Sequence, residues 1–306
     1  MSGSTNAYIW ILVSGDSTYD SRSIDKLCEF FISRHFLNYH IVKQEDIVYK
    51  MSSDGLDTYV HGMRVVDYPS ILYCRIHSDV LKPDVQIPLL RHFEMLGVRV
   101  VNSVDSILKA TNKIWSFLEL AKAGIPIPLT LSYCSEKLDT YNPPEEGGLI
   151  YPLICKSVRG NKGNKVFMIN TDTMRKELEG VLQHDVPYLY QEYICESHGR
   201  DLRVIVVDKQ AICSVIRQCN TDSVCSQKGD GVVVTGKFQE AEDLAVKIAG
   251  VLGTEICCID LLLKDDIGFI CCDVNNTPSY SKFIYDEHMV EHYIGGYLFK
   301  LMGVTP

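Results

Sequence analysis

Two apolar segments near the C-terminal end of the chain each carry acidic side chains. Residues 256–263 and 269–275 are separated by a short polar stretch, which is typical of two antiparallel strands joined in a hairpin. If residues 265–268 form the loop, Asp260 lies directly opposite Asp273, and Asn275 shares the face of Asp273. Mg²⁺ takes one or two carboxylates and completes its shell with phosphates and water. The spacing therefore predicts a magnesium site on this hairpin.

The two opposed carboxylates create an electrostatic problem that a bound cation would solve. Like charges directly opposite each other destabilise a sheet, so Asp260 and Asp273 are expected to repel when no metal is bound. An exposed acidic face without an ion is the plainer interpretation of the same pattern. Cys258 and Cys271 are expected on this face too and would suit a softer metal, but no His lies near them in sequence, which disfavours zinc.

Lysines and glycines in the middle of the chain form a pattern that suits phosphate binding. Lys156 lies inside an apolar segment, where an unpaired lysine is rare. The loop that follows it contains Gly160 and Gly163 among several cations, and such a loop can close over phosphates with its backbone N–H groups. Lys113, at the start of a helical segment, could supply a second cation, although a solvated surface lysine is the commoner interpretation of that residue alone.

A short polar stretch ends another expected strand. Gln191, Glu192, Tyr193 and Ile194 close an apolar run that begins at residue 188. The backbone at such a strand end can pair with an adenine, while the carboxylate accepts hydrogen bonds from ribose hydroxyls. Taken alone, these four residues are a weak signal for a nucleotide.

Strands and helices alternate in the part of the chain that precedes these residues. They are expected at residues 7–13, 21–36, 70–75, 85–96 and 98–101. This alternation favours a parallel α/β unit over roughly the first 105 residues. A further helix is expected over residues 106–124, because Gly124 and then Pro126 and Pro128 form a typical helix stop.

From residue 151 onward the pattern changes to short strands in close succession. Asp208 and Lys209 interrupt two apolar runs, which indicates a hairpin over residues 204–216. Helices are expected at 171–183 and 240–252. This half is therefore expected to be α+β with antiparallel sheets.

Composition excludes several classes of protein. The 306 residues carry a net charge of −9, which argues against a nucleic-acid backbone as the main partner. No apolar run reaches the roughly 18 residues that a membrane span needs. The N-terminal residues 1–6 lack the pattern of a signal peptide, and the 12 cysteines are scattered along the chain. A cytoplasmic location with reduced thiols is expected.

Together and in this order, these segments resemble the ATP-grasp superfamily. Within it they are similar to the RimK-like glutamate ligases, and among those to the animal N-acetylaspartylglutamate and β-citrylglutamate synthases. The resemblance covers roughly residues 70–295. It is carried by the segments 101–108, 112–117, 124–128, 151–160, 184–203, 258–262 and 272–275, which include Val101-Asn102-Ser103, Asn112-Lys113, Gln191-Glu192-Tyr193 and Cys272-Asp273-Val274-Asn275.

The resemblance implies a role for each matching residue. Lys113 and Lys156 would hold the phosphates of ATP, under a flap that contains Gly160 and Gly163. Residues 191–194 would form the adenine hinge, with Asp201 and Arg217 also near the nucleotide. Asp260, Asp273 and Asn275 would bind Mg²⁺, with Mn²⁺ as an alternative metal. The fold would be an N-terminal α/β domain, residues 1–108, followed by an α+β ATP-grasp module, residues 109–306, with lobes of about 109–190 and 191–300.

The chain departs from the family pattern at two places near these residues. The family usually has Glu where this chain has Asp273, and Asp is one methylene shorter. Val224 stands near the position of an expected Asn. Both departures bear on the metal and on the substrate rather than on nucleotide binding.

The implied reaction is the ATP-dependent joining of glutamate to a small polycarboxylic acid, such as N-acetylaspartate or citrate, through an acylphosphate. Arg203 and Arg217, and also Arg75, could clamp substrate carboxylates, because a guanidinium matches a carboxylate with two parallel hydrogen bonds. An ion pair with a purely structural role is the alternative for each arginine. A small-molecule kinase and a nucleotide-binding protein without catalysis are the other function classes. Small molecules, not nucleic acid or membrane, are the expected partners, and the sequence does not indicate an oligomeric state.

Overall fold

The computed structural model of the 306-residue chain describes residues 8–15, 21–77, 81–132, 148–160, 166–182, 187–219, 230–280 and 283–304. Gly163, Val224 and residues 161–165 of the predicted flap lie outside these ranges.

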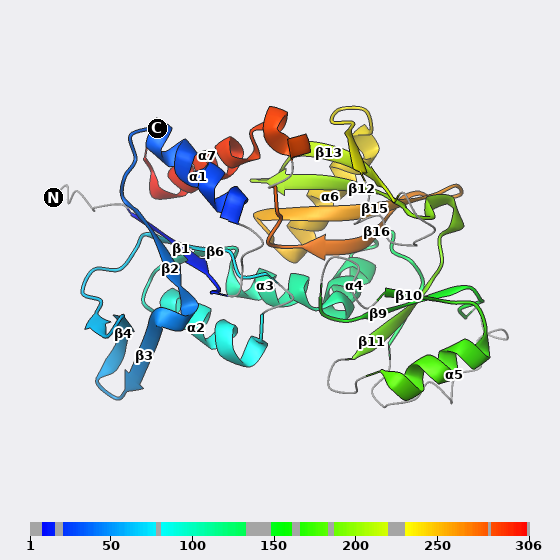
Figure 1. Ribbon diagram of the computed structural model, residues 1–306, viewed down its shortest axis with the longest axis horizontal. Coiled ribbons are helices and arrows are strands. Elements are labelled where there is room, and N and C mark those ends of the chain that lie inside the picture. Colours follow the sequence, from blue (N-terminus) through cyan, green and yellow to red (C-terminus); the bar gives the residue numbers. More distant parts are fainter. Residues whose placement is uncertain are drawn as a thin grey trace.

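The first part of the chain forms the predicted parallel α/β unit (Figure 1). Its four-stranded sheet has the order β2-β1-β6-β7, and all three strand pairs are parallel. The strands are β1 Ile9–Val13, β2 Tyr39–Lys43, β6 Ile71–Cys74 and β7 Arg99–Val101, and the helices are α1 Ser21–Ser33 and α2 Pro83–Met95. Strand β1 is buried at all five positions because α1 and α2 pack on its two faces.

A small antiparallel sheet for which the sequence carried no prediction is attached to this unit. The short 3-10 helix η1 Gln44–Asp46 precedes it in the chain. Its strands are β3 Ile47–Ser52, β4 Gly55–Val60 and β5 Met63–Arg64. The β3–β4 turn ends at Gly55, whose φ of +135° is a conformation that residues with a Cβ rarely adopt. Thr58 and His92 join the sheet to α2 by a buried hydrogen bond of 2.8 Å.

The single helix predicted over residues 106–124 is wrong, because the structure has two helices there. They are α3 Val104–Thr111 and α4 Lys113–Lys122. Asn112 between them has an extended backbone, with φ −104° and ψ 107°, and its side chain caps α4 by accepting from Trp115 N. This break places Lys113 at the first turn of α4, where its backbone N–H donates to Val158 O.

The next sheet forms one lobe of the second half of the molecule. Its four antiparallel strands have the order β10-β9-β11-β8, and helix α5 Asp172–Val181 packs beside them. The strands are β8 Thr130–Leu131, β9 Leu153–Ser157, β10 Val166–Ile169 and β11 Tyr188–Glu192. In Figure 1 this green lobe lies at the end of the molecule away from β1.

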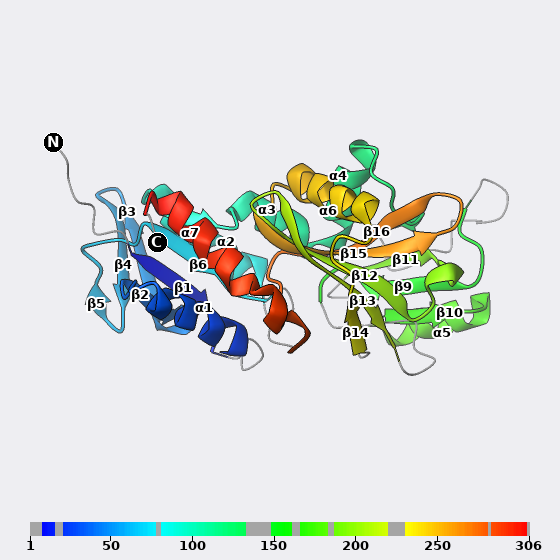
Figure 2. The same ribbon diagram turned by 90° about the horizontal axis from the view of Figure 1, so that it is seen from above.

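A five-stranded antiparallel sheet forms the centre of the molecule (Figures 1 and 2). Its order is β14-β13-β12-β15-β16, which includes the predicted hairpin at Asp208 and Lys209 between β12 and β13. The strands are β12 Arg200–Val207, β13 Gln210–Gln218, β14 Asp230–Val233, β15 Ile256–Lys264 and β16 Gly268–Asn275, and η2 Cys195–Ser197 precedes them. Helix α6 Gln239–Leu252 and α4 cover one face with an apolar core. Part of the other face packs toward α7.

The end of the chain returns to the first unit. After η4 Phe283–His288, helix α7 Val290–Met302 runs beside α1 (Figure 2). Phe299 stacks on Phe30 and Phe31 of α1, with ring centroids 5.7 and 5.5 Å apart. A Cβ at Gly295 would lie 2.2 Å from the Phe30 ring, so this close approach of the two helices requires glycine. One apolar core therefore joins the N-terminal unit, α7 and the central sheet.

The structure confirms an α/β unit followed by an α+β module with two lobes. Among the described residues, none of the helices has the length and apolarity needed to cross a bilayer.

Candidate active site

The predicted pairing of Asp260 with Asp273 is confirmed, although the hairpin reaches it by a different route. The strands close one residue tighter than predicted, with Lys264 opposite Gly268. The ladder then shifts at a bulge, which restores the pair Asp260–Asp273. The placement of Cys271 on the acidic face is wrong as a result, because the register pairs it with Leu261 and it is fully buried in the apolar core.

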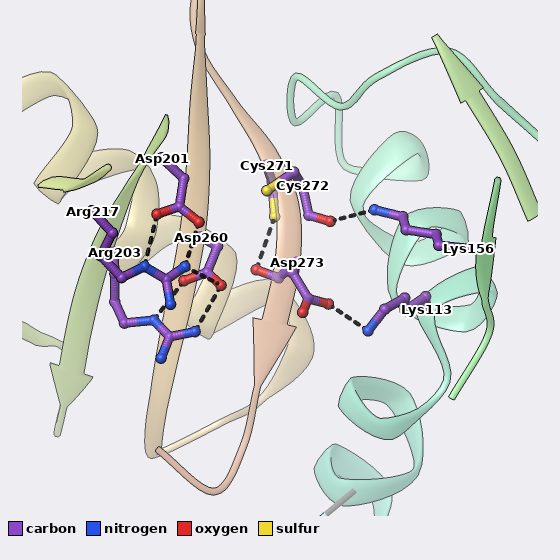
Figure 3. A network of polar contacts seen from close by, with 9 residues as sticks. All are labelled: Lys113, Lys156, Asp201, Arg203, Arg217, Asp260, Cys271, Cys272 and Asp273. Atoms are coloured by element: carbon purple, nitrogen blue, oxygen red, sulfur yellow. Dashed lines mark hydrogen bonds and ion pairs between the residues drawn. The ribbon is translucent and has the colours of Figure 1, made fainter. Parts of the chain in front are cut away.

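Asp260 is held by two arginines of the same sheet, Arg203 of the adjacent strand β12 and Arg217 of β13, the strand beyond it (Figure 3). Arg203 Nε donates to Oδ1 and Arg203 Nη2 to Oδ2, both at 2.7 Å, and Arg217 Nη2 lies 2.9 Å from Oδ2. Burial alone would raise the pKa of the Asp260 carboxyl, but the charges of Arg203 and Arg217 outweigh it and hold that pKa well below its usual range. The carboxylate is therefore ionised and compensated without a metal.

Asp201 completes this buried cluster of charges. It lies opposite Arg217 in the β12–β13 ladder and accepts two hydrogen bonds from its guanidinium, one of them from Nε at 2.7 Å. Both side chains are less than a tenth exposed. Arg203, Arg217, Asp201 and Asp260 thus form an alternating network of two positive and two negative groups, which meets the requirement that buried charges be paired.

Asp273 points to the other side of β16, toward the lobe that carries β9 (Figure 3). Lys113 Nζ lies 2.7 Å from Asp273 Oδ1 and also donates to Gly160 O at 3.1 Å. The helix break at Asn112 places Lys113 where it contacts both Gly160, at the start of the predicted flap, and Asp273, a predicted metal ligand.

Lys156 approaches the same strand from β9. Its Nζ donates to Cys272 O at 2.9 Å and lies 5.4 Å from the centre of the Phe117 ring. Burial lowers the pKa of the Lys156 ammonium, and the charge of Lys113 lowers it further, while the carboxylate of Asp273 acts in the opposite direction. One lysine at the start of α4 and one in β9 of the other sheet therefore converge on β16.

The predicted hinge residues lie where the two lobes join. Glu192 accepts from Leu129 N and from Lys264 Nζ, both at 3.0 Å, so its carboxylate is already held on both sides. Gln191 is buried and donates to the Thr130 hydroxyl. Ile194 is buried at the end of this segment. Tyr193 contacts His198.

Asn275 and Arg75 occupy the junction between the central sheet and the N-terminal unit. Asn275 Oδ1 accepts from Thr277 N at 2.9 Å, which orients its amide oxygen. Arg75 is 1% exposed, and its guanidinium donates to Pro278 O and to the Tyr73 hydroxyl. In this structure Arg75 is therefore a buried contact between the two halves of the chain.

The donor set of the hairpin is compatible with Mg²⁺. Asp260 Oδ1 has one hydrogen-bond donor in the network, so it keeps a lone pair, and Asp273 uses one oxygen for Lys113. In the described ranges, no group of three or more His, Cys, Asp or Glu side chains could hold a metal ion. Protein oxygens alone would fill only part of a shell, which is the arrangement Mg²⁺ adopts when substrate phosphates complete it.

The sequence did not identify three groups at this site. Phe117 lies under Lys156, and its helical position gives no signal other than an apolar residue of α4. The Cys272 carbonyl is a backbone group, so no residue type could have marked it. Lys264 pairs with Glu192 across the hinge, a contact between residues 72 positions apart. All the predicted site residues other than Gly163 lie in the described ranges.

A protein-family comparison matches residues 110–290 to the RimK-like ATP-grasp domain, a range that contains every predicted site residue except Arg75. β-Citrylglutamate synthase B of Homo sapiens is 32% identical over 289 residues, covering 92% of this chain and 74% of that protein. N-acetylaspartylglutamate synthase A of Homo sapiens is 35% identical over 255 residues, covering 82% of this chain and 65% of that protein. A probable α-L-glutamate ligase of Stenotrophomonas maltophilia is 28% identical over 237 residues, covering 75% of this chain and 77% of that protein.

Solved structures share the fold over nearly the whole chain. A RimK-domain ATP-grasp protein of Sphaerobacter thermophilus superimposes with a TM-score of 0.71 at 17% identity, covering 95% of this chain and 99% of that one. The ATP-grasp ligase PsnB, solved with a variant of its precursor, Mg and ADP, superimposes with a TM-score of 0.70 at 16% identity, covering 97% of this chain and 99% of PsnB. At these identities the similarity concerns the fold.

Proposed function

This chain belongs to the RimK-like ATP-grasp family, and we propose that it is an ADP-forming ligase that joins the amine of glutamate to a carboxylate of a small polycarboxylic acid. The observation that carries this proposal is the convergence of Lys113, at the start of α4, and Lys156, of β9, on the acidic strand β16. Two lysine ammonium groups on the strand that carries Asp273, beside the strand that carries Asp260, form a site into which a nucleoside triphosphate with its metal would fit.

The reaction would proceed in two steps. A carboxylate oxygen of the acid attacks the γ-phosphorus of ATP, the bond from that phosphorus to the β,γ-bridging oxygen breaks, and ADP leaves. The glutamate amine then attacks the acyl carbon of the acylphosphate, inorganic phosphate leaves with the bond electrons, and the amine loses a proton. Each step moves negative charge onto phosphate oxygens, where fixed cations lower the barrier most.

The two lysines would hold that charge. Lys156 is largely desolvated, and among the described residues it contacts the Cys272 carbonyl and the Phe117 ring, so phosphate oxygens would offer it a stronger partner than these. Lys113 would exchange its contact with Asp273 for the nucleotide, with Gly160 and Gly163 in the flap above. The backbone of residues 191–194 would receive the adenine, and Asp201 would lie near the nucleotide.

Asp260, Asp273 and Asn275 would hold Mg²⁺, and we propose that Mn²⁺ can replace it. The bound metal would neutralise phosphate charge as a Lewis acid. The family pattern has Glu at the position of Asp273, so the shorter side chain distinguishes the proposed metal site of this chain from that pattern.

Arg203 and Arg217 are proposed as the groups nearest the reacting carboxylates. Arg203 uses Nε and Nη2 for Asp260, so Nη1 stays available for a substrate oxygen. Arg217 is more deeply buried between Asp201 and Asp260, which favours an orienting role toward the nucleotide.

Small molecules are the proposed partners, and the cytoplasm is the proposed location. The cysteines of the described ranges are free thiols, which supports a reducing compartment.

The test is a mass-spectrometric screen of the purified protein with ATP, Mg²⁺, glutamate and a panel of di- and tricarboxylic acids. An amide product formed with one equivalent of ADP supports the proposal and identifies the acid. A phosphorylated hydroxyl compound with no amide would instead indicate a kinase. Nucleotide binding without ADP release from any combination would indicate a protein without catalysis, the alternative that Asp273 favours.

A further inference from the structure

The side chain of Asn102 joins the N-terminal unit to both strands of the acidic hairpin. Asn102 follows β7 directly and is 2% exposed. Its Nδ2 donates to Ile256 O at 2.7 Å and to Asn276 O at 2.9 Å. Its Oδ1 accepts from Glu255 N at 2.8 Å and from Ile256 N at 2.9 Å. A primary amide has two donors and two acceptor lone pairs, so all of its hydrogen-bonding capacity is used.

These four hydrogen bonds lie where the β15–β16 ladder ends. The last pair of that ladder is Cys258 with Asn275. Beyond this pair, the Asn102 side-chain amide bonds to both the N–H and the C=O of Ile256, as the backbone of a neighbouring strand would. Its Nδ2 also donates to the carbonyl of Asn276, the residue after Asn275. Asn102 therefore determines how far the end of β16 lies from the start of β15.

The segment after Asn275 is held from the N-terminal unit at two more points. Thr277 Oγ1 donates to Ile76 O at 3.3 Å, and Arg75 Nη2 donates to Pro278 O at 2.9 Å. Thr277 N in turn donates to Asn275 Oδ1. A continuous set of hydrogen bonds thus connects the carboxyl ends of β6 and β7 to the amide oxygen of a proposed metal ligand.

We propose that Asn102 is a positioning residue for the metal site, acting through the backbone of residue 276 on the orientation of Asn275. The inference rests on the proposed function, because it takes Asn275 as a ligand of Mg²⁺. Groups that orient metal ligands from behind typically change metal affinity by 10- to 100-fold when they are replaced. Asn102 occupies such a position although it belongs to another domain of the chain.

The test compares nucleotide binding with and without metal. The affinity of the full-length protein for the non-hydrolysable analogue AMP-PNP is measured by calorimetry in EDTA and again in saturating Mg²⁺, and the ratio of the two is the gain due to the metal. Asn102→Asp keeps the shape of the side chain but turns an oxygen toward the carbonyls of Ile256 and Asn276. The gain due to the metal is expected to fall by about tenfold or more, with the affinity in EDTA unchanged.

Ser197→Ala is the matched control. The Ser197 hydroxyl donates to Leu263 O and accepts from Leu263 N, so it holds the opposite end of the same strand β15. This variant is expected to lower thermal stability without changing the ratio, as a purely structural contact would. If Asn102→Asp does not fold, Asn102→Ala, which buries no charge, is measured in the same way.

The outcomes separate the inference from the proposed function. A ratio in the Asn102 variant equal to that of the wild type overturns the inference and leaves the function intact. An equal loss of affinity in EDTA and in Mg²⁺ also overturns it, because the defect would then not concern the metal. A wild-type protein that gains nothing from Mg²⁺ overturns the proposed metal site, and the inference with it.

Discussion

Asp260 and Asp273 face each other across the β15–β16 ladder, yet their carboxylates have separate cationic partners. Asp260 is bound by Arg203 and Arg217 of the same sheet, whereas Asp273 is bound by Lys113 at the start of α4. The expected repulsion between the opposed carboxylates is therefore offset in the protein without metal. Asp260 is held within the central sheet, and Asp273 connects that sheet to Lys113, which in turn contacts the Gly160 carbonyl.

The first prediction concerns the stability of the protein without ligands. We expect Asp260→Asn to lower the free energy of unfolding by about 3–5 kcal/mol, because it leaves two buried guanidinium groups with one carboxylate between them. The sequence alone predicts that Asp260 and Asp273 repel each other without metal, which would make removal of one carboxylate neutral or stabilising, so this expected loss reverses that prediction. The measurement is denaturant unfolding in EDTA without nucleotide.

Asp286→Asn is the control for this experiment. Asp286 also pairs with two cations, Arg22 and Lys26, but at an exposed position. Exposed ion pairs contribute little, so its replacement should leave the unfolding midpoint nearly unchanged. Equal small effects of both substitutions would show that the buried network does not stabilise the sheet.

The second prediction concerns pH. The pKa of the Asp260 carboxyl is held below its usual range in the folded protein, so its contribution to stability is fully present above the pKa of the unfolded chain, about 4. The contribution is lost as the pH falls from there toward the folded pKa. The difference in unfolding free energy between wild type and Asp260→Asn should therefore be constant from about pH 5 to 7 and shrink below about pH 4. A difference that does not change with pH in the acid range would contradict the ionised network.

The third prediction separates stability from binding at Lys156. Because burial lowers the pKa of this ammonium, its charged form opposes folding at neutral pH when no phosphate is bound. Lys156→Met keeps the aliphatic contact with Phe117 and removes the charge, so the protein without ligands should be as stable as the wild type or more so. Nucleotide affinity should fall by about 1.5–3 kcal/mol, which is about tenfold or more, by calorimetry.

Lys176→Met serves as the comparison for that variant. Lys176 lies exposed on α5 and pairs with Asp172 of the same helix. Its loss should alter neither stability nor nucleotide affinity appreciably. Unchanged nucleotide affinity in Lys156→Met would remove Lys156 from the proposed phosphate site.

Local pattern was sufficient to predict most strands and helices and the opposition of Asp260 and Asp273. Alternation and turn residues act over a few positions, and they identified both hairpins of the central sheet. The bulge in β16 was not predictable, because no residue of the segment signals it; its effect is to place Cys271 in the apolar core. The prediction of the pair succeeded because the tighter loop and the bulge offset each other.

The partners of the site residues depend on contacts that no local pattern contains. Arg203 and Asp260 are 57 positions apart, and Lys113 and Asp273 are 160 positions apart. The split between α3 and α4 follows from Asn112, whose capping role is a local signal that the apolar spacing of the segment obscured. Asn102 looked like one residue of a family motif until the structure placed it against Ile256.

The last prediction concerns the length of the side chain at position 273. Asp273 reaches Lys113 with an Oδ1–Nζ distance of 2.7 Å, and Lys113 is also held by Gly160 O, so the lysine cannot retreat without losing its second contact. Glu, the usual residue of the family at this position, would extend the carboxylate into the lysine. We expect Asp273→Glu to lower turnover by up to about 100-fold, because displacements of about 1 Å at a reacting centre have effects of that size.

Turnover of ATP and the acid substrate found in the screen is the measurement, with Asp273→Asn as the control that removes the charge at nearly constant shape and should abolish ADP formation. If Glu raises turnover above that of the wild type, the native Asp273 is a handicap, and the alternative of a protein without efficient catalysis gains support. If Asp273→Glu lowers turnover, and the double variant with Lys113→Arg lowers turnover no further, the two residues have adapted to each other. The effects of residues in direct contact are not additive.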